Sequence, residues 1–317
     1  MKLSFVVPCY RSANSISDVV NRIVTTVKAD GRYDYEIICV DDCSPDNTLD
    51  VLRSLAKKSH NIKVIALSKN FGQHGALMSG YNHITGDIVI SLDDDGQNPP
   101  EEVFKLIDKV NEGYDLVSAK YPEKKHGFIR RLGSKISFFM SRNLVGMPKH
   151  IELNSYCAFR RFIADEIIKY SNPYPFVHGL MLRVTRNIAN VEISHQERQQ
   201  GQSGYTLSKL FGLWMNGFTA FSEKPLRIAS ILGGLSVGSS FIGFLVLIIK
   251  KIINPEFLAF SYSLLFVIIL LFGITMLLIG LLGEYIGRMY ICINNAPQYA
   301  VREKINFDEN NDSVILY

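Results

Sequence analysis

The sequence lacks the signatures by which several common enzyme classes are identified. No G-x-G-x-x-G follows the first apolar run and no G-x-x-x-x-G-K-[ST] occurs anywhere, which argues against the usual dinucleotide fold and against a P-loop. No serine or cysteine stands between glycines at a strand-to-helix elbow, so a nucleophilic triad is not supported. The five cysteines form no C-x-x-C pair, and we interpret them as reduced thiols facing a cytosol.

The chain also has little excess charge of either sign. The formal net charge is only +4, and no basic run is interleaved with aromatics, which argues against nucleic acid as a partner and favours a weak attraction to anionic lipid headgroups. An apolar content of 47% without repeats or sustained heptads excludes a disordered chain and a coiled coil. The N-terminus reaches Pro8 after few apolar residues, which argues against a secretory signal peptide.

A long apolar region lies near the C-terminus. The only charged residues between positions 228 and 283 are Lys250, Lys251 and Glu256. Two segments, 228–249 and 262–282, are each long enough at about 20 residues to cross a bilayer, so we predict two transmembrane helices. A buried hairpin in a protein core is the alternative. Lysines and arginines on both sides of the region predict that both ends are cytoplasmic.

The segment in front of these spans has apolar side chains at helical spacing opposite a polar face, which predicts an amphipathic helix in the membrane interface. The chain is therefore expected to have four parts. These are a cytoplasmic catalytic domain at 1–202, the interfacial region at 203–227, the two spans within 228–283, and a cytoplasmic C-terminal tail at 284–317.

The first part of the chain alternates short β-branched apolar runs with amphipathic stretches, as a parallel sheet covered by helices requires. The runs expected as strands are 3–8, 35–40, 62–67, 87–92 and 114–119, and the stretches expected as helices are 15–28, 47–58, 75–84 and 100–111. This pattern predicts a Rossmann-like α/β domain with a mostly parallel sheet. Such sheets bind ligands beyond the carboxyl ends of their strands, which makes the residues after each run the candidate site.

The run ISLDDDGQNPPEE is the strongest chemical signal. An apolar strand delivers Asp93 and Asp95 into a turn, and alternate residues of a strand point the same way. Two carboxylates aimed together repel each other unless a cation lies between them. The motif therefore predicts a hard divalent ion completed by substrate phosphates and water. A solvated acidic turn that caps the next helix is the alternative.

A second acidic motif, CVDDCSPDNT, also follows an apolar run. Asp46 or Asn47 can cap the next helix, whereas Asp41 and Asp42 at the strand end suit hydrogen bonds to a ribose hydroxyl or a base N–H.

The segment HQERQQGQSGY, residues 195–205, has an arginine and hydroxyls that suit closure over a phosphate, with a flexible linker as the alternative. His178 and His195 are isolated, and we interpret them as packing or hydrogen-bonding residues.

Taken together, these motifs resemble glycosyltransferase family 2, and within it the polyprenyl-phosphate glycosyltransferases related to dolichyl-phosphate mannose synthase. The layout is most similar to the bacterial undecaprenyl-phosphate formamido-arabinose transferases. The stretches that carry the resemblance are VVPCYRSANSI, CVDDCSPDNT, NFGQHGALMSGYNHITGD, SLDDDGQNPPE, HQERQQGQSGYTLSKL and GLLGEYIGRMY. The resemblance thus covers nearly the whole chain.

The resemblance implies a GT-A fold and assigns roles to individual residues. It implies that the nucleotide is bound by Pro8, Tyr10, Asp41 and Asp42. It implies that Mg²⁺ or Mn²⁺ is held by Asp93, Asp95 and Gln97, and that the catalytic residues are Asp93, Asp95 and Arg198. It implies that the acceptor or its phosphate is bound by Arg130, Ser134, Arg198 and Ser203.

The activity that the resemblance implies is inverting, metal-dependent transfer of a sugar from a UDP-linked donor to undecaprenyl phosphate. We expect a multi-pass protein of the bacterial inner membrane, acting at its cytoplasmic face, whose lipid-linked monosaccharide serves cell-envelope glycan or lipopolysaccharide modification. Relatives suggest a homo-oligomer, such as a tetramer. Two alternatives are a membrane scaffold that binds nucleotide-sugar without transfer, and a transferase acting on a diacylglycerol-type lipid.

Overall fold

The computed structural model describes residues 1–121, 151–173, 175–194, 260–293 and 297–307, together with positions 242, 246, 249, 252 and 253. The chain divides into two compact units, one formed by residues 1–205 with 295–317 and the other by residues 206–294. The predicted residues that lie outside the described ones are Arg130, Ser134, His195, Arg198 and Ser203, with most of the first span and the whole predicted interfacial region.

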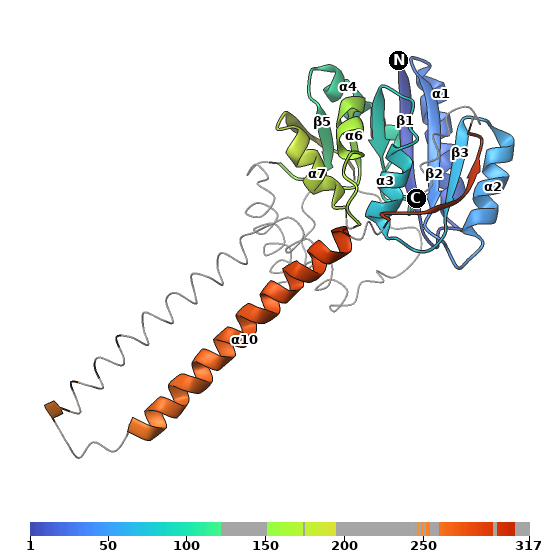
Figure 1. Ribbon diagram of the computed structural model, residues 1–317. Coiled ribbons are helices and arrows are strands. Elements are labelled where there is room, and N and C mark those ends of the chain that lie inside the picture. Colours follow the sequence, from blue (N-terminus) through green and yellow to red (C-terminus); the bar gives the residue numbers. More distant parts are fainter. Residues whose placement is uncertain are drawn as a thin grey trace. The chain divides into compact units, whose positions relative to one another are not determined.

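The first unit is built on an eight-stranded sheet with the order β7-β5-β6-β4-β1-β2-β3-β8 (Figure 1). Its strands are β1 (Lys2–Cys9), β2 (Asp34–Asp41), β3 (Ile62–Leu67), β4 (Ile88–Ser91), β5 (Leu116–Lys120), β6 (Cys157–Arg160), β7 (Ile188–Glu192) and β8 (Val301–Ile305). β1 pairs in parallel with β2 and β4, β2 with β3, and β5 with β7. The pairs β4–β6, β5–β6 and β3–β8 are antiparallel.

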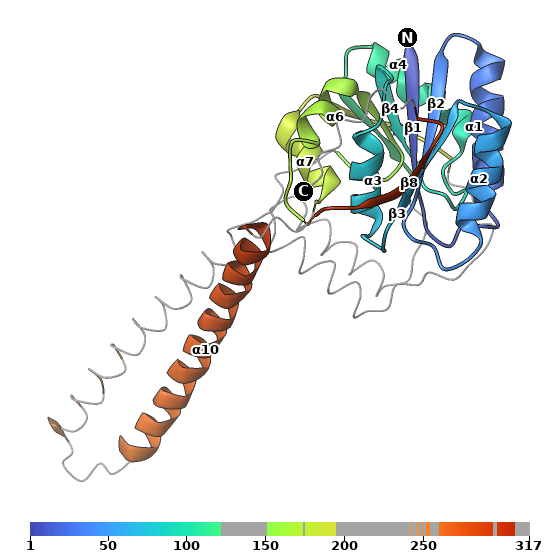
Figure 2. The same ribbon diagram turned by 45° about the vertical axis from the view of Figure 1, so that its right-hand side comes forward.

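Helices cover both faces of the sheet (Figures 1 and 2). They are α1 (Ile16–Asp30), α2 (Thr48–Lys58), α3 (Gln73–Tyr81), the 3₁₀ turn η1 (Pro100–Glu102), α4 (Val103–Asn111), α6 (Arg161–Ile167) and α7 (Val177–Val184). Side chains of α1, α2 and α4 share one apolar core with Leu3, Phe5 and Val7 of β1. The next residue on the other face of β1, Val6, contacts Gly80 of α3. Alternate residues of a buried strand thus serve both layers.

The five strands and four helices expected from the sequence are present, and the α/β architecture with a mostly parallel sheet is confirmed. The sequence pattern did not predict that β6 inserts antiparallel between β4 and β5. A short apolar run has the same composition whichever way it runs, so its direction is decided by long-range pairing alone.

Residues of the predicted C-terminal tail return to the first unit as strand β8, which lies along β3 at the edge of the sheet (Figure 2). Gln298 is buried and its amide donates to the carbonyl oxygen of Asn172 at 2.8 Å. Arg53 of α2 forms an ion pair with Glu303 at 2.5 Å. Asn306, in the left-handed backbone region, donates to the carbonyl oxygens of Ala56 and Ile62, each at 2.8 Å. Residues 297–307 of the predicted tail are therefore part of the edge of the first unit.

The second unit contains helix α10 (Phe260–Ile293), which includes the segment predicted as the second span and continues past it. As far as the described residues go, no helix meets the criteria of length and hydropathy for crossing a membrane.

Candidate functional site

The candidate site lies at the edge of the sheet where β1, β2 and β4 end. Because these strands are parallel, the loops after Cys9, Asp41 and Ser91 meet at that edge. The antiparallel strand β6 begins there, with Cys157 opposite Ser91. The Asp42 backbone N–H donates to the carbonyl oxygen of Cys9 at 2.9 Å, which joins the first two loops directly.

The loop after β1 is held by side chains from its neighbours. Four consecutive backbone N–H groups, of residues 10–13, donate to side chains of two other loops and of the first turn of α2. The pairs are Tyr10 to Asp94 at 3.0 Å, Arg11 to Ser44 at 3.1 Å, Ser12 to Thr48 at 2.9 Å and Ala13 to Asp46 at 3.4 Å. Arg11 adopts a left-handed φ of 58°, and Cys43 of the next loop a φ of 54°. Such strained conformations persist only where the surroundings fix them, and they cluster at functional sites.

Asp41 and Asp42 have different environments although they are adjacent and both buried. The two carboxylate oxygens of Asp42 accept from the backbone N–H groups of Phe71 at 2.7 Å and Gly72 at 2.8 Å. The carboxylate of Asp41 interacts with the Ser44 side chain and accepts longer bonds from the Ser44 N–H, at 3.3 and 3.4 Å. Asp42 therefore ties the loop after β3 to the site, and Asp41 is the better placed of the two to contact a ligand.

Asp93 is the centre of a network that draws on three further parts of the chain. Its carboxylate accepts from the side-chain amides of Gln73 at 2.8 Å and Asn98 at 3.3 Å, and from the Ser155 hydroxyl. The Tyr121 hydroxyl in turn donates to Asn98 Oδ1 at 2.6 Å. Asp95 accepts the backbone N–H of Gln97 at 3.0 Å across a turn in which Gly96 has a φ of 75°. The predicted metal residues are thus brought together in one turn.

Four carboxylates of this edge have raised pKa values, which means that their environment favours the protonated form. Burial raises the pKa of Asp93, and the nearby charge of Asp95 adds to the effect. Burial raises the pKa of Asp94 to about 6. It also raises the pKa of both Asp41 and Asp42. Within the described ranges, none of these four carboxylates forms an ion pair with a lysine or arginine.

Glu36, at the opposite end of β2, is a buried carboxylate whose charge is compensated by lysines. Its buried carboxylate accepts from Lys63 Nζ at 2.9 Å and Lys2 Nζ at 3.3 Å, and from Ser4 Oγ and the Thr85 N–H, each at 2.6 Å. Burial alone would raise its pKa, but these donors lower it to about 2. A buried carboxylate that lacks a cationic partner is energetically costly. The acidic edge is therefore suited to an external cation.

The donor set fits a hard divalent ion. Asp93 and Asp95 are hard oxygen ligands, and one or two carboxylates with substrate phosphates and water form the usual Mg²⁺ arrangement. Across the described ranges, no group of three or more His, Cys, Asp or Glu side chains is arranged to hold a metal. The ion would thus depend on Gln97, substrate or water for its remaining ligands.

Of the remaining predicted site residues, the described Pro8 and Tyr10 lie at this edge as well. Pro8 is buried in β1, and Tyr10 is 44% exposed at the rim. Sequence reasoning missed Gln73, Asn98 and Ser155 as partners of Asp93. Asn98 lies within the acidic motif and was within reach of prediction. Ser155 lies 62 positions from Asp93, and nothing local signals their contact.

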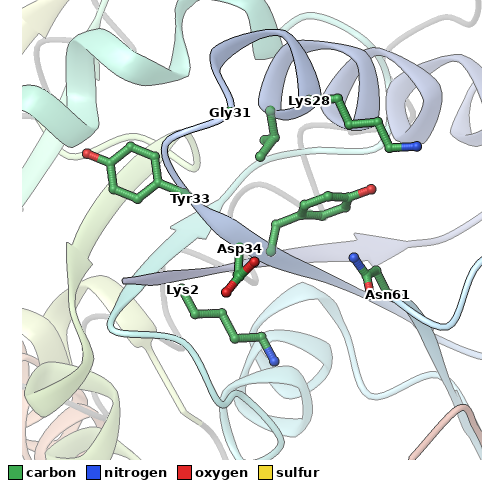
Figure 3. Close-up of a pocket in the computed structure, with 8 residues that line it drawn as sticks. Lys2, Lys28, Gly31, Tyr33, Asp34 and Asn61 are labelled. Atoms are coloured by element: carbon green, nitrogen blue, oxygen red, sulfur yellow. The ribbon is translucent and has the colours of Figure 1, made fainter.

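A cavity of about 500 Å³ lies at the other end of the sheet. Figure 3 shows that Lys28 comes from helix α1 and Lys2 from strand β1, with Asp34 between them. This cavity lies at the amino ends of β1 and β2, away from the edge where sheets of this kind bind ligands. Asp34 is its only carboxylate, so the cavity lacks the paired acids of the candidate site. We assign the chemistry to the acidic edge.

Comparison with solved structures supports the fold. The chain is 21% identical to mannosyl-3-phosphoglycerate synthase from Rubrobacter xylanophilus, with a TM-score of 0.51 over 68% of this chain and 71% of that one. It is also 21% identical to glucosyl-3-phosphoglycerate synthase from Mycobacterium tuberculosis in complex with Mn²⁺, UDP-glucose and phosphoglyceric acid. There the TM-score is 0.52 over 69% and 77% of the two chains. The prediction of Mg²⁺ or Mn²⁺ as cofactor agrees with the Mn²⁺ of that complex.

The family model of Glycosyl transferase family 2 matches residues 4–168. The match starts in β1 and ends just after α6, so it includes both acidic motifs and Ser155. It covers more than half of the 317 residues, and the chain therefore belongs to glycosyl transferase family 2, whose members are inverting nucleotide-sugar glycosyltransferases.

Proposed function

We propose that this enzyme transfers a sugar from a UDP-linked donor to a polyprenyl phosphate, such as undecaprenyl phosphate, at the cytoplasmic face of a bacterial inner membrane. The observation that carries the donor half is the acidic edge. There burial raises the pKa of Asp41, Asp93 and Asp94, and none of the three forms an ion pair with a described lysine or arginine. A nucleoside diphosphate accompanied by Mg²⁺ or Mn²⁺ supplies the missing positive charge and the phosphate ligands together.

The membrane half of the proposal rests on the sequence. Positions 228–249 are free of charged residues, as are positions 262–282. The second of these segments lies within the 34-residue helix α10. Segments of this length and composition are typical of transmembrane helices. An acceptor that is itself a membrane lipid would explain why a glycosyltransferase carries them.

A phosphate acceptor would react without a catalytic base. The second pKa of a phosphate monoester is about 6, so at neutral pH the acceptor is mostly ionised and needs no general base. Its oxygen attacks the anomeric carbon and forms the new C–O bond. The bond from that carbon to the diphosphate oxygen breaks, UDP leaves, and the configuration inverts. A lipid with a free hydroxyl would instead require a base to remove its proton.

Asp93 and Asp95 would hold the metal in this reaction, with Gln97 in the same turn. When bound, the metal neutralises charge that develops on the departing diphosphate. Gln73, Asn98 and Ser155 keep the Asp93 carboxylate in a fixed direction. The segment 195–205, which follows β7, is proposed to contact phosphate through Arg198 and Ser203. Arg130 and Ser134 are proposed to bind the acceptor.

The test is sugar transfer by the purified full-length protein in detergent with Mn²⁺ or Mg²⁺. Donors are UDP-linked and other nucleotide sugars, and acceptors are undecaprenyl phosphate, diacylglycerol and 3-phosphoglycerate. We expect labelled lipid only with undecaprenyl phosphate. Transfer to 3-phosphoglycerate, the compound named in the fold relatives, or to diacylglycerol would refute the acceptor assignment.

The same assay tests the metal site. Asp95→Asn should lower turnover by about 100-fold, equivalent to about 2.7 kcal/mol, and should weaken Mn²⁺ binding measured by titration calorimetry. Asp108→Asn is the matched control, because this carboxylate is 56% exposed and pairs with Arg32 away from the site. Full activity of Asp95→Asn would show that the metal is held elsewhere, and full Mn²⁺ affinity with lost turnover would assign Asp95 a role other than metal binding.

A further inference from the structure

Arg11 has a backbone conformation that costs energy. Its φ of 58° lies in the left-handed region, which disfavours residues with a Cβ by about 1–2 kcal/mol. The hydrogen bonds at the N–H groups of residues 10–13 hold this conformation from two neighbouring loops and the start of α2. Glycine would fit here without strain, so the backbone gives no reason for an arginine at this position. The reason is to be sought in its side chain.

The side chain of Arg11 lies at the rim of the candidate site. Its guanidinium carbon is 5.4 Å from the centre of the Tyr10 ring, and both residues are exposed. Among the described residues Arg11 forms no ion pair. Such a stacked cation is positioned by the ring rather than neutralised by a carboxylate. No described carboxylate therefore neutralises the positive charge of Arg11.

The position of Arg11 relates this charge to the two acidic loops. Its N–H bonds Ser44, whose own N–H donates to Asp41. Its neighbour Tyr10 bonds Asp94, next to the proposed metal residues. Arg11 therefore stands between the loop proposed for the nucleoside and the loop proposed for the metal, which is where the diphosphate of a nucleotide donor would lie.

From this arrangement we infer that Arg11 is a donor-binding residue whose guanidinium contacts the phosphate groups of the nucleotide-sugar. The inference deepens the proposed function and rests on its nucleoside diphosphate donor. A diphosphate that approaches an edge with several carboxylates needs positive charge on more than one side, and a metal at Asp93 and Asp95 supplies only one. The planar guanidinium binds phosphate through paired N–H groups.

The experiment compares two glycine substitutions. Arg11→Gly and Cys43→Gly each remove a left-handed non-glycine residue from this edge, and only the first removes a charge. The affinities of the full-length protein in detergent for UDP and for uridine are measured by calorimetry in the presence of Mn²⁺. We expect neither variant to lower the melting temperature. Arg11→Gly should weaken UDP binding about 10-fold or more without changing uridine binding, and Cys43→Gly should match the wild type.

The outcomes separate this inference from the proposed function. If the wild type binds UDP and Arg11→Gly binds it equally well, the role of Arg11 is refuted while the donor assignment stands. An equal loss for uridine and UDP would overturn the phosphate contact, as would an equal loss of UDP affinity in Cys43→Gly. If the wild type binds no nucleoside diphosphate from a panel of UDP, GDP, CDP and dTDP, the donor assignment and the inference fail together.

Discussion

Replacing Glu36 by glutamine should destabilise the catalytic unit and change how its stability depends on pH. The carboxylate is 1% exposed and joins its own strand β2 to three other parts of the sheet, since its donors lie in β1, in β3 and just before β4. Glutamine keeps the shape but removes the charge. It also leaves Lys63, which is only 16% exposed, without its carboxylate partner.

The magnitude follows from the pKa of Glu36, which is about 2 against an ordinary value of 4.5. A depression of this size corresponds to about 3 kcal/mol of stability at neutral pH. Because the folded pKa is the lower one, the contribution is complete well above pH 4.5 and is lost as the pH falls toward 2. By the same relation, roughly half of it remains near pH 3.

The assay is thermal unfolding of the full-length protein in detergent, at several pH values between 3 and 8. For a unit of this size, about 3 kcal/mol lowers the melting temperature by roughly 6–12 °C. Glu112→Gln is the control, because that carboxylate is 57% exposed and its ion pair with Lys109 should contribute under about 1 kcal/mol. A loss below about 2 °C for Glu36→Gln at pH 7, or one that does not shrink in acid, would refute the reasoning.

Two further substitutions test how the site is supported. In Gly80→Ala the added Cβ would overlap Val6 Cγ1 and lie 3.3 Å from Val40 Cγ2, so the melting temperature should fall by an amount equivalent to about 1–3 kcal/mol; an unchanged value would mean that α3 moves freely on the sheet. In Asp42→Asn one oxygen acceptor is replaced by a donor, so amide exchange at Phe71 and Gly72 should accelerate about 10-fold or more. Unchanged exchange there would show that Asp42 does not hold this loop.

The sequence pattern was sufficient to find the part of the site that depends on local order. Each acidic motif follows a buried strand, and parallel strands must end at one edge. The proximity of Asp41, Asp42 and the 93–95 run therefore follows from strand direction alone. Local sequence order does not reveal that the two adjacent aspartates have different hydrogen-bond partners. Asp41 and Asp42 read alike in sequence, but only Asp42 meets the backbone of residues 71 and 72.

The parts that sequence reasoning missed all depend on pairing between distant segments. Ser155 reaches Asp93 only because β6 runs antiparallel beside β4, which places its amino end at the site. Strand β8 joins β3 from the far end of the chain, and its residues carry no stronger apolar pattern than an exposed tail. Neither contact can be predicted from hydrophobic periodicity, because the position of such a short strand depends on pairing with strands that are distant in sequence.

The two ends of the sheet shift the pKa values of their carboxylates in opposite directions, and this difference bears on function. At the amino end, Glu36 is matched by two lysines and stays ionised down to low pH. At the carboxyl end, burial raises the pKa of Asp93 and Asp94, and the donors that the described residues offer to Asp93 are all neutral. A fold that can compensate a buried carboxylate with lysine at one end does not lack the means to do so at the other. Because no described lysine or arginine pairs with these carboxylates, the charge at the carboxyl end is best explained by a cation that arrives with the substrate. The guanidinium of Arg11, which pairs with no described carboxylate, is then available to the anionic partner of that cation.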